Sequence, residues 1–231
     1  MSAIYSFVYS DRVHVLTDGG FFHDDGALAG VRRKLFASDT FPLVIACRGR
    51  PAGRIAEIVG EMEAYFERHS ANRGMDACLA AIGDYFAGLK ARSDPFEAEF
   101  LLAAFSETGG PCHFFIHCHG RYDFPAFALF SLGTSDMQAG PPVTLDELAA
   151  IGITTPDIVR PDFPPLHGAT LMQIARRKLE VVPETGKILR LVGGHCELAT
   201  ISADGVEIRT LCRWPDEIGK PIDPTLERMP A

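Results

Sequence analysis

The sequence lacks long apolar runs. No stretch reaches the roughly 18 consecutive apolar residues that a membrane-spanning helix requires. The first residues also lack a basic segment followed by an apolar stretch, which is the pattern of a secretory signal peptide. We therefore expect a cytoplasmic protein with no membrane partner.

Basic residues are scarce relative to acidic ones. The 231-residue chain has 22 Lys and Arg against 30 Asp and Glu, which gives a formal net charge of −8. Basic clusters are short, as at Arg32–Lys34 and Arg176–Lys178. This balance argues against a nucleic-acid partner, because affinity for the phosphate backbone comes largely from Lys and Arg. A single Trp beside 16 Phe favours packing in a core over base-stacking platforms.

Motifs for cofactors and disulfide frameworks are also missing. No Walker or dinucleotide-binding motif is present, so we expect no cofactor. The six cysteines never occur as Cys-x-x-Cys. In a reducing compartment such scattered cysteines are typical of buried small hydrophobic residues.

The apolar residues that are present predict one domain over residues 1–231, with a Pro-rich tail from about residue 213. Hydrophobic residues make up 47% of the chain, which is enough for a large core. Residues 19–33 are rich in Gly and Asp and predict a loop. Apolar alternation and spacing predict strands at 2–9, 12–18, 34–36, 41–47, 98–106, 112–119, 124–131, 189–201 and 206–212. Helical spacing predicts helices from 51 to the mid-60s and at 75–91, 144–150 and 169–181. Because strands and helices come in runs, we expect an α+β fold of antiparallel sheets covered by helices.

The first two strands place two polar residues together. Opposite residues of an antiparallel hairpin have a constant index sum, and a turn centred near residue 10 gives a sum of 20. Ser2 would then stand opposite Asp18, with Cβ atoms about 5 Å apart on the same face. Lys34 begins the next predicted strand, within reach of the same point.

These three groups suit nucleophilic catalysis. A serine hydroxyl needs a base, and a free α-amine with a pKa near 7.7–8.0 is partly neutral at physiological pH. If Met1 is removed, Ser2 carries the nucleophile and the base on one residue. A Lys34 ammonium would depress both pKa values, and an Asp18 carboxylate would hold that lysine charged and oriented.

Ser2, Asp18 and Lys34 together resemble the pattern of the N-terminal-nucleophile hydrolases, in particular proteasome β-type and HslV-like subunits. The resemblance implies a four-layer αββα sandwich of two antiparallel sheets and hydrolysis of an amide or peptide bond. It also implies assembly into a homo-oligomer, of which a ring is one form. The Ala46–Gly49 turn is similar to the turn that donates the oxyanion N–H in this family, which gives that role to Arg48 or Gly49.

Two later segments extend the resemblance. Residues 131–135 are similar to a Gly-Ser-Gly stretch of the family, which implies that Thr134 or Ser135 lies near the nucleophile. Gly193–Gly194 resembles the pair that opens the last hairpin. Before that pair, active members carry an Asp and a Ser, where this chain has Leu189 and Val192. The alternative is therefore a catalytically silent proteasome-like subunit with a structural or binding role.

The segment 111–120 offers a competing site, because it holds two cysteines and three histidines. His117 and His119 share one face of a strand by parity and are candidate ligands for a zinc ion, with His195 and Cys196 as possible further ligands. Ordinary strand histidines and buried thiols are the alternative interpretation. A Cys–His nucleophile from the same segment is also possible, although no spacing singles one out. We expect no metal ion in this protein, and His117 and His119 are the candidate ligands if one is bound.

Overall fold

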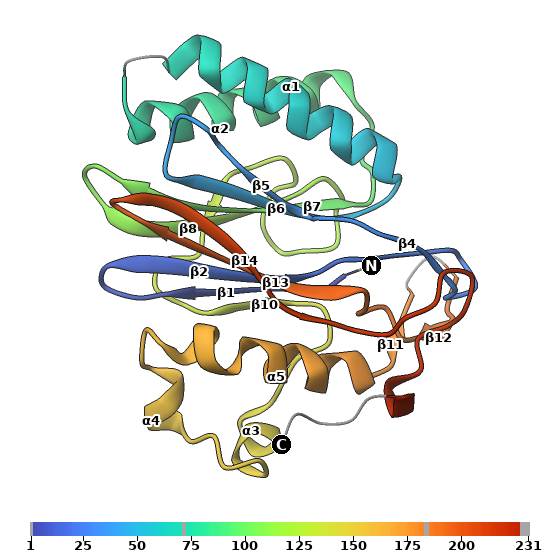
Figure 1. Cartoon of the computed structure of the whole chain (residues 1–231). Helices are drawn as coiled ribbons and strands as arrows, with labels where there is room; N and C mark the ends of the chain where they lie inside the picture. Colours follow the sequence, from blue (N-terminus) through green and yellow to red (C-terminus); the bar gives the residue numbers. More distant parts are fainter. Residues whose placement is uncertain (1, 71–72, 183–184, 227–231) are drawn as a thin grey trace.

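A computed structural model describes residues 2–70, 73–182 and 185–226 of the chain (Figure 1). Met1, whose removal would free the Ser2 amine, lies outside the described residues, as does the end of the C-terminal tail at 227–231. Up to residue 131 the elements are β1 (Ile4–Val8), β2 (Arg12–Asp18), β3 (Gly20–Phe22), β4 (Leu28–Val31), β5 (Leu35–Ala37), β6 (Leu43–Gly49), α1 (Ala52–Ser70), α2 (Met75–Arg92), β7 (Ala98–Ser106), β8 (Gly110–His117) and β9 (Phe130–Ser131). The rest are β10 (Met137–Ala139), α3 (Leu145–Ala149), α4 (Thr155–Ile158), α5 (Phe163–Arg177), β11 (Glu180–Val181), β12 (Ile188–Leu189), β13 (His195–Ser202), β14 (Gly205–Arg213) and the 3₁₀ helix η1 (Pro224–Leu226).

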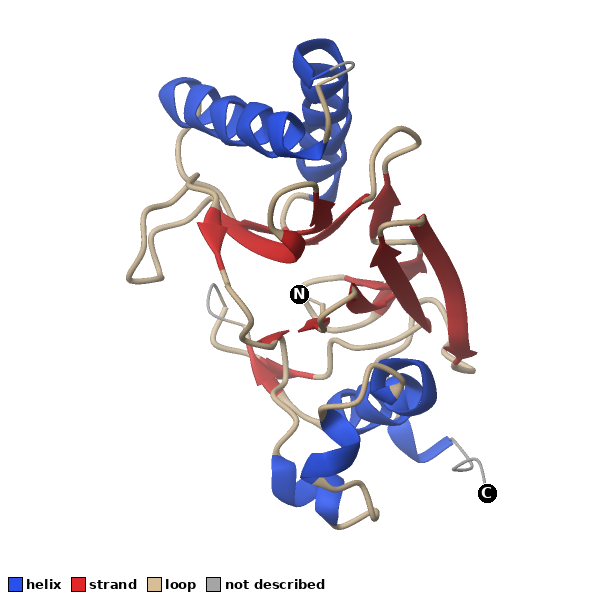
Figure 2. Ribbon diagram, turned by 90° about the vertical axis from the view of Figure 1, so that its left-hand side faces the viewer, coloured by secondary structure: helices blue, strands red, loops and turns tan. Residues whose placement is uncertain are grey.

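The fold is α+β with antiparallel sheets. In the described part of the chain, sheet I has the strand order β10-β1-β2-β13-β14 and sheet II the order β5-β6-β7-β8-β9. Two short hairpins, β3-β4 and β11-β12, stand apart from them. In both ribbon views the helices lie outside the strands, with α1 and α2 at one end and α3, α4 and α5 at the other (Figures 1 and 2).

Three clusters of buried apolar side chains hold these elements together. One joins sheet I to sheet II through residues such as Ile4, Val15, Val44 and Leu101. A second packs α1 and α2 on sheet II, and a third packs α3 and α5 on sheet I. Burial of apolar surface on both faces of each sheet explains why the strands contain nearly continuous apolar runs.

The sequence correctly places most elements, and four predictions are wrong. The strand predicted at 189–201 is interrupted, because residues 190–194 separate β12 from β13. Residues 19–33 form the hairpin β3-β4 instead of a loop. Only the last two residues of the strand predicted at 124–131 are a strand, because the preceding residues turn back over β8. Helix α5 begins at Phe163 and not near 169, since Pro164 and Pro165 fit the first helical turn.

The segment that follows β14 is packed against the rest of the chain. The indole Nε1–H of Trp214 donates to Gln173 on α5 at 2.7 Å. Asp216 forms a buried ion pair with Arg176, and Ala27 bridges to Pro221. The tail therefore covers the end of α5 and the Gly193–Gly194 segment as part of the domain. No helix within the described ranges is both long enough and apolar enough to cross a lipid bilayer.

Buried His14 predicts that acid destabilises the fold. Its Nε2 lies 3.0 Å from the Pro161 carbonyl and its Nδ1 3.0 Å from the Thr200 hydroxyl, so a neutral ring satisfies both contacts. Burial lowers the pKa of His14 from 6.5 to about 4. Between those values the unfolded chain binds the additional proton, so the free energy of unfolding falls as pH falls.

Each pH unit between 6.5 and 5 changes the free energy of unfolding by about 1.36 kcal/mol. Protonation of His14 in the unfolded chain should therefore lower that free energy by about 2 kcal/mol between pH 7 and pH 5. We expect His14→Gln to reduce the pH dependence of urea denaturation by that amount, whereas His23→Gln, at an exposed position, should not change it. An unchanged pH dependence in His14→Gln would contradict a neutral buried ring.

Candidate active site

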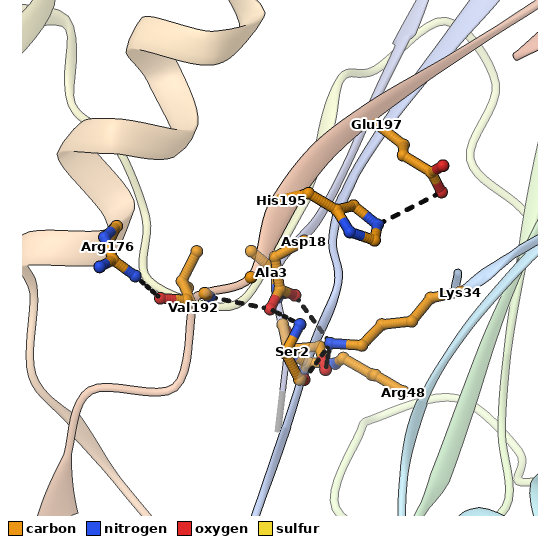
Figure 3. Close-up of polar contacts among 12 residues, drawn as sticks. Ser2, Ala3, Asp18, Lys34, Arg48, Arg176, Val192, His195 and Glu197 are labelled. Carbon is orange, nitrogen blue, oxygen red and sulfur yellow. Dashed lines mark hydrogen bonds and ion pairs between the residues drawn. The ribbon is translucent and has the colours of Figure 1, made fainter. Parts of the chain in front are cut away.

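Lys34 joins three segments of the chain at one buried point (Figure 3). Its Nζ lies 2.5 Å from Ser2 Oγ, 3.0 Å from Asp18 Oδ1 and 2.5 Å from the carbonyl oxygen of Gly20. Only 3% of the Lys34 side chain is exposed. An ammonium group has three N–H donors, and these three acceptors match them in number. The predicted association of Ser2, Asp18 and Lys34 is thus present in the structure.

Asp18 is the other half of a buried ion pair, and its carboxylate also accepts main-chain donors. Oδ1 accepts from Ala3 N at 3.0 Å, and Oδ2 accepts from Gly20 N at 3.0 Å and from Gly193 N at 3.1 Å. Hydrogen bonds in which the acceptor is charged are shorter and stronger than neutral ones. Asp18 therefore ties the start of β1, the start of β3 and the segment before β13 to the lysine.

Ser2 reaches this point by a different register from the predicted one. Ile4 stands opposite Thr17, so the index sum of the first hairpin is 21 and not 20. The turn consists of two residues, Ser10 and Asp11, and is closed by a bond from Tyr9 N to Arg12 O. Asp18 consequently lies across from Ala3, and Lys34 makes the link from Asp18 to the Ser2 hydroxyl.

Burial makes the Lys34 proton easier to lose. Desolvation lowers the pKa of the Lys34 ammonium below its ordinary value of 10.5, and the Asp18 charge opposes that shift. The lysine is therefore a cation held by its partners in a place that disfavours charge. Such a group can polarise the bonded hydroxyl and can also exchange protons with it.

Arg48 contacts Ser2 through its side chain. Its Nη1 donates to the Ser2 carbonyl oxygen at 3.1 Å, while its Nε pairs with Glu99 on the neighbouring strand β7. Glu99 in turn accepts from Tyr122 and lies 2.9 Å from His119 Nε2. Burial would raise the pKa of Glu99, but the Arg48 charge and the hydrogen bonds from Arg48, His119 and Tyr122 together hold it below its ordinary value.

Gly49, the other predicted oxyanion residue, requires its glycine. Its φ is +128°, and an added Cβ would lie 2.0 Å from the Glu97 carbonyl oxygen. Successive main-chain N–H groups along β6 point alternately to the two edges of the strand. Cys47 N donates to the Lys34 carbonyl at 3.4 Å, so Gly49 N–H points to that same edge and Arg48 N–H to the opposite one.

Thr134 and Ser135 do not lie beside Ser2, which corrects the sequence prediction. Strand β10 pairs with β1 at Ile4 opposite Ala139, an index sum of 143. Continued to Ser135, that register places it opposite Val8. Val8 is six residues from Ser2, which is about 20 Å along the strand at 3.3 Å per residue. Both residues are exposed.

Gly140 occupies the place that was expected for them. A Cβ on Gly140 would lie 3.1 Å from the Ser2 carbonyl oxygen and 3.0 Å from the Ala3 Cα, and its φ is +124°. The close approach of this segment to the chain start therefore depends on glycine.

The Gly193–Gly194 segment is fixed from behind. The Arg176 guanidinium donates to the Val192 carbonyl at 3.2 Å and to Asp216 at 2.8 Å, and Gly194 N donates to the same carboxylate at 2.7 Å. Val192 is buried in the core between α5 and sheet I. Leu189 packs against Gly26. Neither side chain brings a polar group to Ser2.

Glu180 is a residue that the sequence analysis missed. It is half-buried on β11, and its buried Oε2 atom has no hydrogen-bond partner among the described residues. Burial raises the pKa of Glu180, and Arg48, Asp18 and Glu99 are close enough to influence it electrostatically. A buried carboxylate oxygen without a partner, close enough to Arg48 and Asp18 to interact electrostatically, is a candidate for holding a cationic group.

The histidines considered as metal ligands contact other groups of the protein. His117 Nε2 lies 3.0 Å from the Phe124 carbonyl, and His119 bonds Glu99. His195 belongs to sheet I, where its Nε2 is 3.5 Å from Glu197 Oε2. Over the described ranges, no three His, Cys, Asp or Glu side chains are arranged to hold a metal ion. The six cysteines, all within the described ranges, form no disulfide with one another.

Comparison with known proteins identifies no relative: no protein-family model matches the chain, and no curated protein sequence matches it.

Asp18→Asn should strongly destabilise the protein. The amide cannot pair with the buried Lys34 charge or accept every bond that the carboxylate accepts. Breaking a buried pair by removing one partner costs about 3–5 kcal/mol. Urea denaturation measures this loss, and Glu217→Gln, in an exposed pair with Lys220, should cost less than about 1 kcal/mol. If both variants lost the same small amount of unfolding free energy, Asp18 and Lys34 would not form a buried ion pair.

Glu180→Gln should alter the pH dependence of stability. Because the folded-state pKa of Glu180 is raised, its contribution is present below the unfolded value of 4.5 and is lost as pH rises through the folded value. The variant has no such loss, so its free energy of unfolding relative to wild type should increase from pH 4.5 upward. Denaturation at pH 4.5 and 7.5 measures the difference, with the exposed Glu207→Gln as control. A constant difference would show that Glu180 has an ordinary pKa.

Proposed function

We propose that the protein is an N-terminal-nucleophile hydrolase, similar to proteasome β-type subunits, that cleaves an amide or peptide bond with Ser2. The observation that carries this proposal is the contact of Lys34 Nζ with both Ser2 Oγ, at 2.5 Å, and Asp18, at 3.0 Å. A lysine that is buried with a carboxylate and one serine hydroxyl at the chain start is suited to activating that hydroxyl.

The four-layer αββα sandwich belongs to the same proposal. Support comes from the core clusters, one between the two sheets and one between each sheet and its helices. In this arrangement the site lies where the ends of β2 and β6 meet the start of β1.

In the proposed reaction, removal of Met1 leaves Ser2 with a free α-amine. Ser2 Oγ attacks the amide carbonyl carbon, and its proton passes to that amine. The proton then moves to the leaving nitrogen as the C–N bond breaks, which leaves an ester on Ser2. Water adds to the ester carbonyl, gives one proton to the amine, and releases the carboxylic acid with the Ser2 hydroxyl restored.

The neighbouring groups have separate roles in this scheme. Lys34 lowers the pKa of the hydroxyl and the amine, and Asp18 orients Lys34. The Gly49 N–H stabilises the oxyanion, because it points to the edge of β6 that faces Lys34. Arg48 holds the Ser2 carbonyl, so the Arg48 side chain positions the nucleophile from the other side.

We further propose a cytoplasmic protein that forms a homo-oligomer, of which a ring is one form, and whose partner is a peptide or amide substrate. The oligomer and the substrate class rest on the resemblance of Ser2, Asp18 and Lys34 to the family pattern, and the compartment rests on the sequence pattern. The second candidate function is a catalytically silent subunit with a structural or binding role. The apolar Leu189 and Val192, at positions where active members are polar, favour it.

Intact mass measured before and after treatment with a β-lactone acylating probe separates the two. We expect a mass without Met1 and one probe adduct, because Ser2 is the activated hydroxyl. Ser2→Ala should abolish the adduct, whereas Ser10→Ala, at the exposed turn of the first hairpin, should retain it. A mass that retains Met1 with no adduct would favour the silent subunit.

A further inference from the structure

A cavity of about 340 Å³ adjoins the Ser2 site. It lies where β10 and the loop after β9 face the end of β8, and its volume is within the range of small-molecule and side-chain sites. Its lining residues are Arg48, Phe115, Tyr122, Phe124, Leu132, Met137, Gln138, Ala139 and Gly140.

Two lining residues connect the cavity to Ser2 directly. Arg48 donates to the Ser2 carbonyl at 3.1 Å, and Gly140 approaches that same oxygen so closely that a Cβ would lie 3.1 Å from it. A group bonded to the Ser2 hydroxyl therefore has this cavity as a neighbour, because Arg48 and Gly140 both lie against the carbonyl of Ser2 itself.

One wall of the cavity is aromatic. Phe124 stacks on Phe130 with ring centroids 4.4 Å apart and on Tyr122 at 5.5 Å, with interplanar angles of 21° and 10°. Phe115 meets Tyr122 edge-on at 5.6 Å. Tyr122, which lines the cavity, remains 39% exposed, so part of this ring surface is open to an incoming group.

The polar groups of the lining are already engaged. Arg48 is paired with Glu99, and the Tyr122 hydroxyl bonds the same carboxylate at 2.9 Å. The Gln138 amide bonds both main-chain polar groups of Val143, at 2.8 Å and 3.4 Å. A charged ligand would have to displace one of these partners, whereas an apolar ligand leaves them intact.

We propose that this cavity binds a large apolar side chain, by preference an aromatic one, on the acyl part of the amide substrate. This assignment rests on the proposed function of Ser2. Aromatic rings gain from offset stacking and edge contacts with other rings, which a side chain entering beside Tyr122 and Phe124 would make.

The test uses three β-lactone probes that differ only in their side chain: methyl, benzyl and carboxymethyl. The rate of the mass increase at Ser2 is measured for each. Burial of an aromatic group should make the benzyl probe react about 10–100 times faster than the methyl probe. Leu132→Trp fills the cavity and should slow the benzyl probe far more than the methyl probe, so that most of the benzyl advantage is lost. Continued reaction of the methyl probe shows that the variant is folded.

Leu166→Trp is the matched control, since Leu166 is 66% exposed on α5, and it should keep the benzyl preference. Equal rates for benzyl and methyl, a faster carboxymethyl probe, or an equal effect of Leu132→Trp on all three probes would overturn the cavity assignment while Ser2 remains a nucleophile. Absence of any adduct with all three probes would instead overturn the proposed function, and the assignment with it.

Discussion

The buried ion pair between Lys34 and Asp18 is the interaction on which the rest of the site depends. Removing two charges from water costs several kcal/mol per ion, and only good geometry with further hydrogen bonds offsets that cost. Here the lysine has three acceptors, and the carboxylate has Lys34 and three main-chain N–H donors. Asp18 ends β2 of sheet I and Lys34 directly precedes β5 of sheet II, so the pair forms only when the two sheets are packed together.

A second ion pair, between Arg48 and Glu99, lies on the other side of Ser2 from the Lys34–Asp18 pair. Arg48 and Glu99 lie opposite each other on β6 and β7, and Arg48 extends to the Ser2 carbonyl. Ser2 is thereby held at its hydroxyl by Lys34 and at its carbonyl by Arg48. The same arginine lines the aromatic cavity, which links positioning of the hydroxyl to the space available for a substrate. Fold, nucleophile and proposed specificity thus share one set of contacts.

Contacts within local hairpins could be predicted from the sequence, and contacts between distant segments could not. Asp18 and the chain start belong to one hairpin, so their proximity follows from a short turn, although the two-residue turn shifts the register by one. Thr134 and Ser135 were misplaced because the pairing of β10 with β1 joins segments more than 130 residues apart, which no local pattern specifies. Gly140 and Glu180 were missed for the same reason. The unpaired Glu180 carboxyl becomes evident only when its burial is known.

The most direct test of the account is the pKa of the Lys34 amine, measured by NMR with ¹⁵Nζ-labelled lysine. The chain has only five lysines, so each signal can be assigned by substitution. The account predicts that Lys34 titrates below the ordinary value of 10.5, apart from an exposed lysine such as Lys220. If Lys34 titrates together with the exposed lysines, it is not buried with Asp18 against Ser2, and the proposed activation of the hydroxyl is wrong.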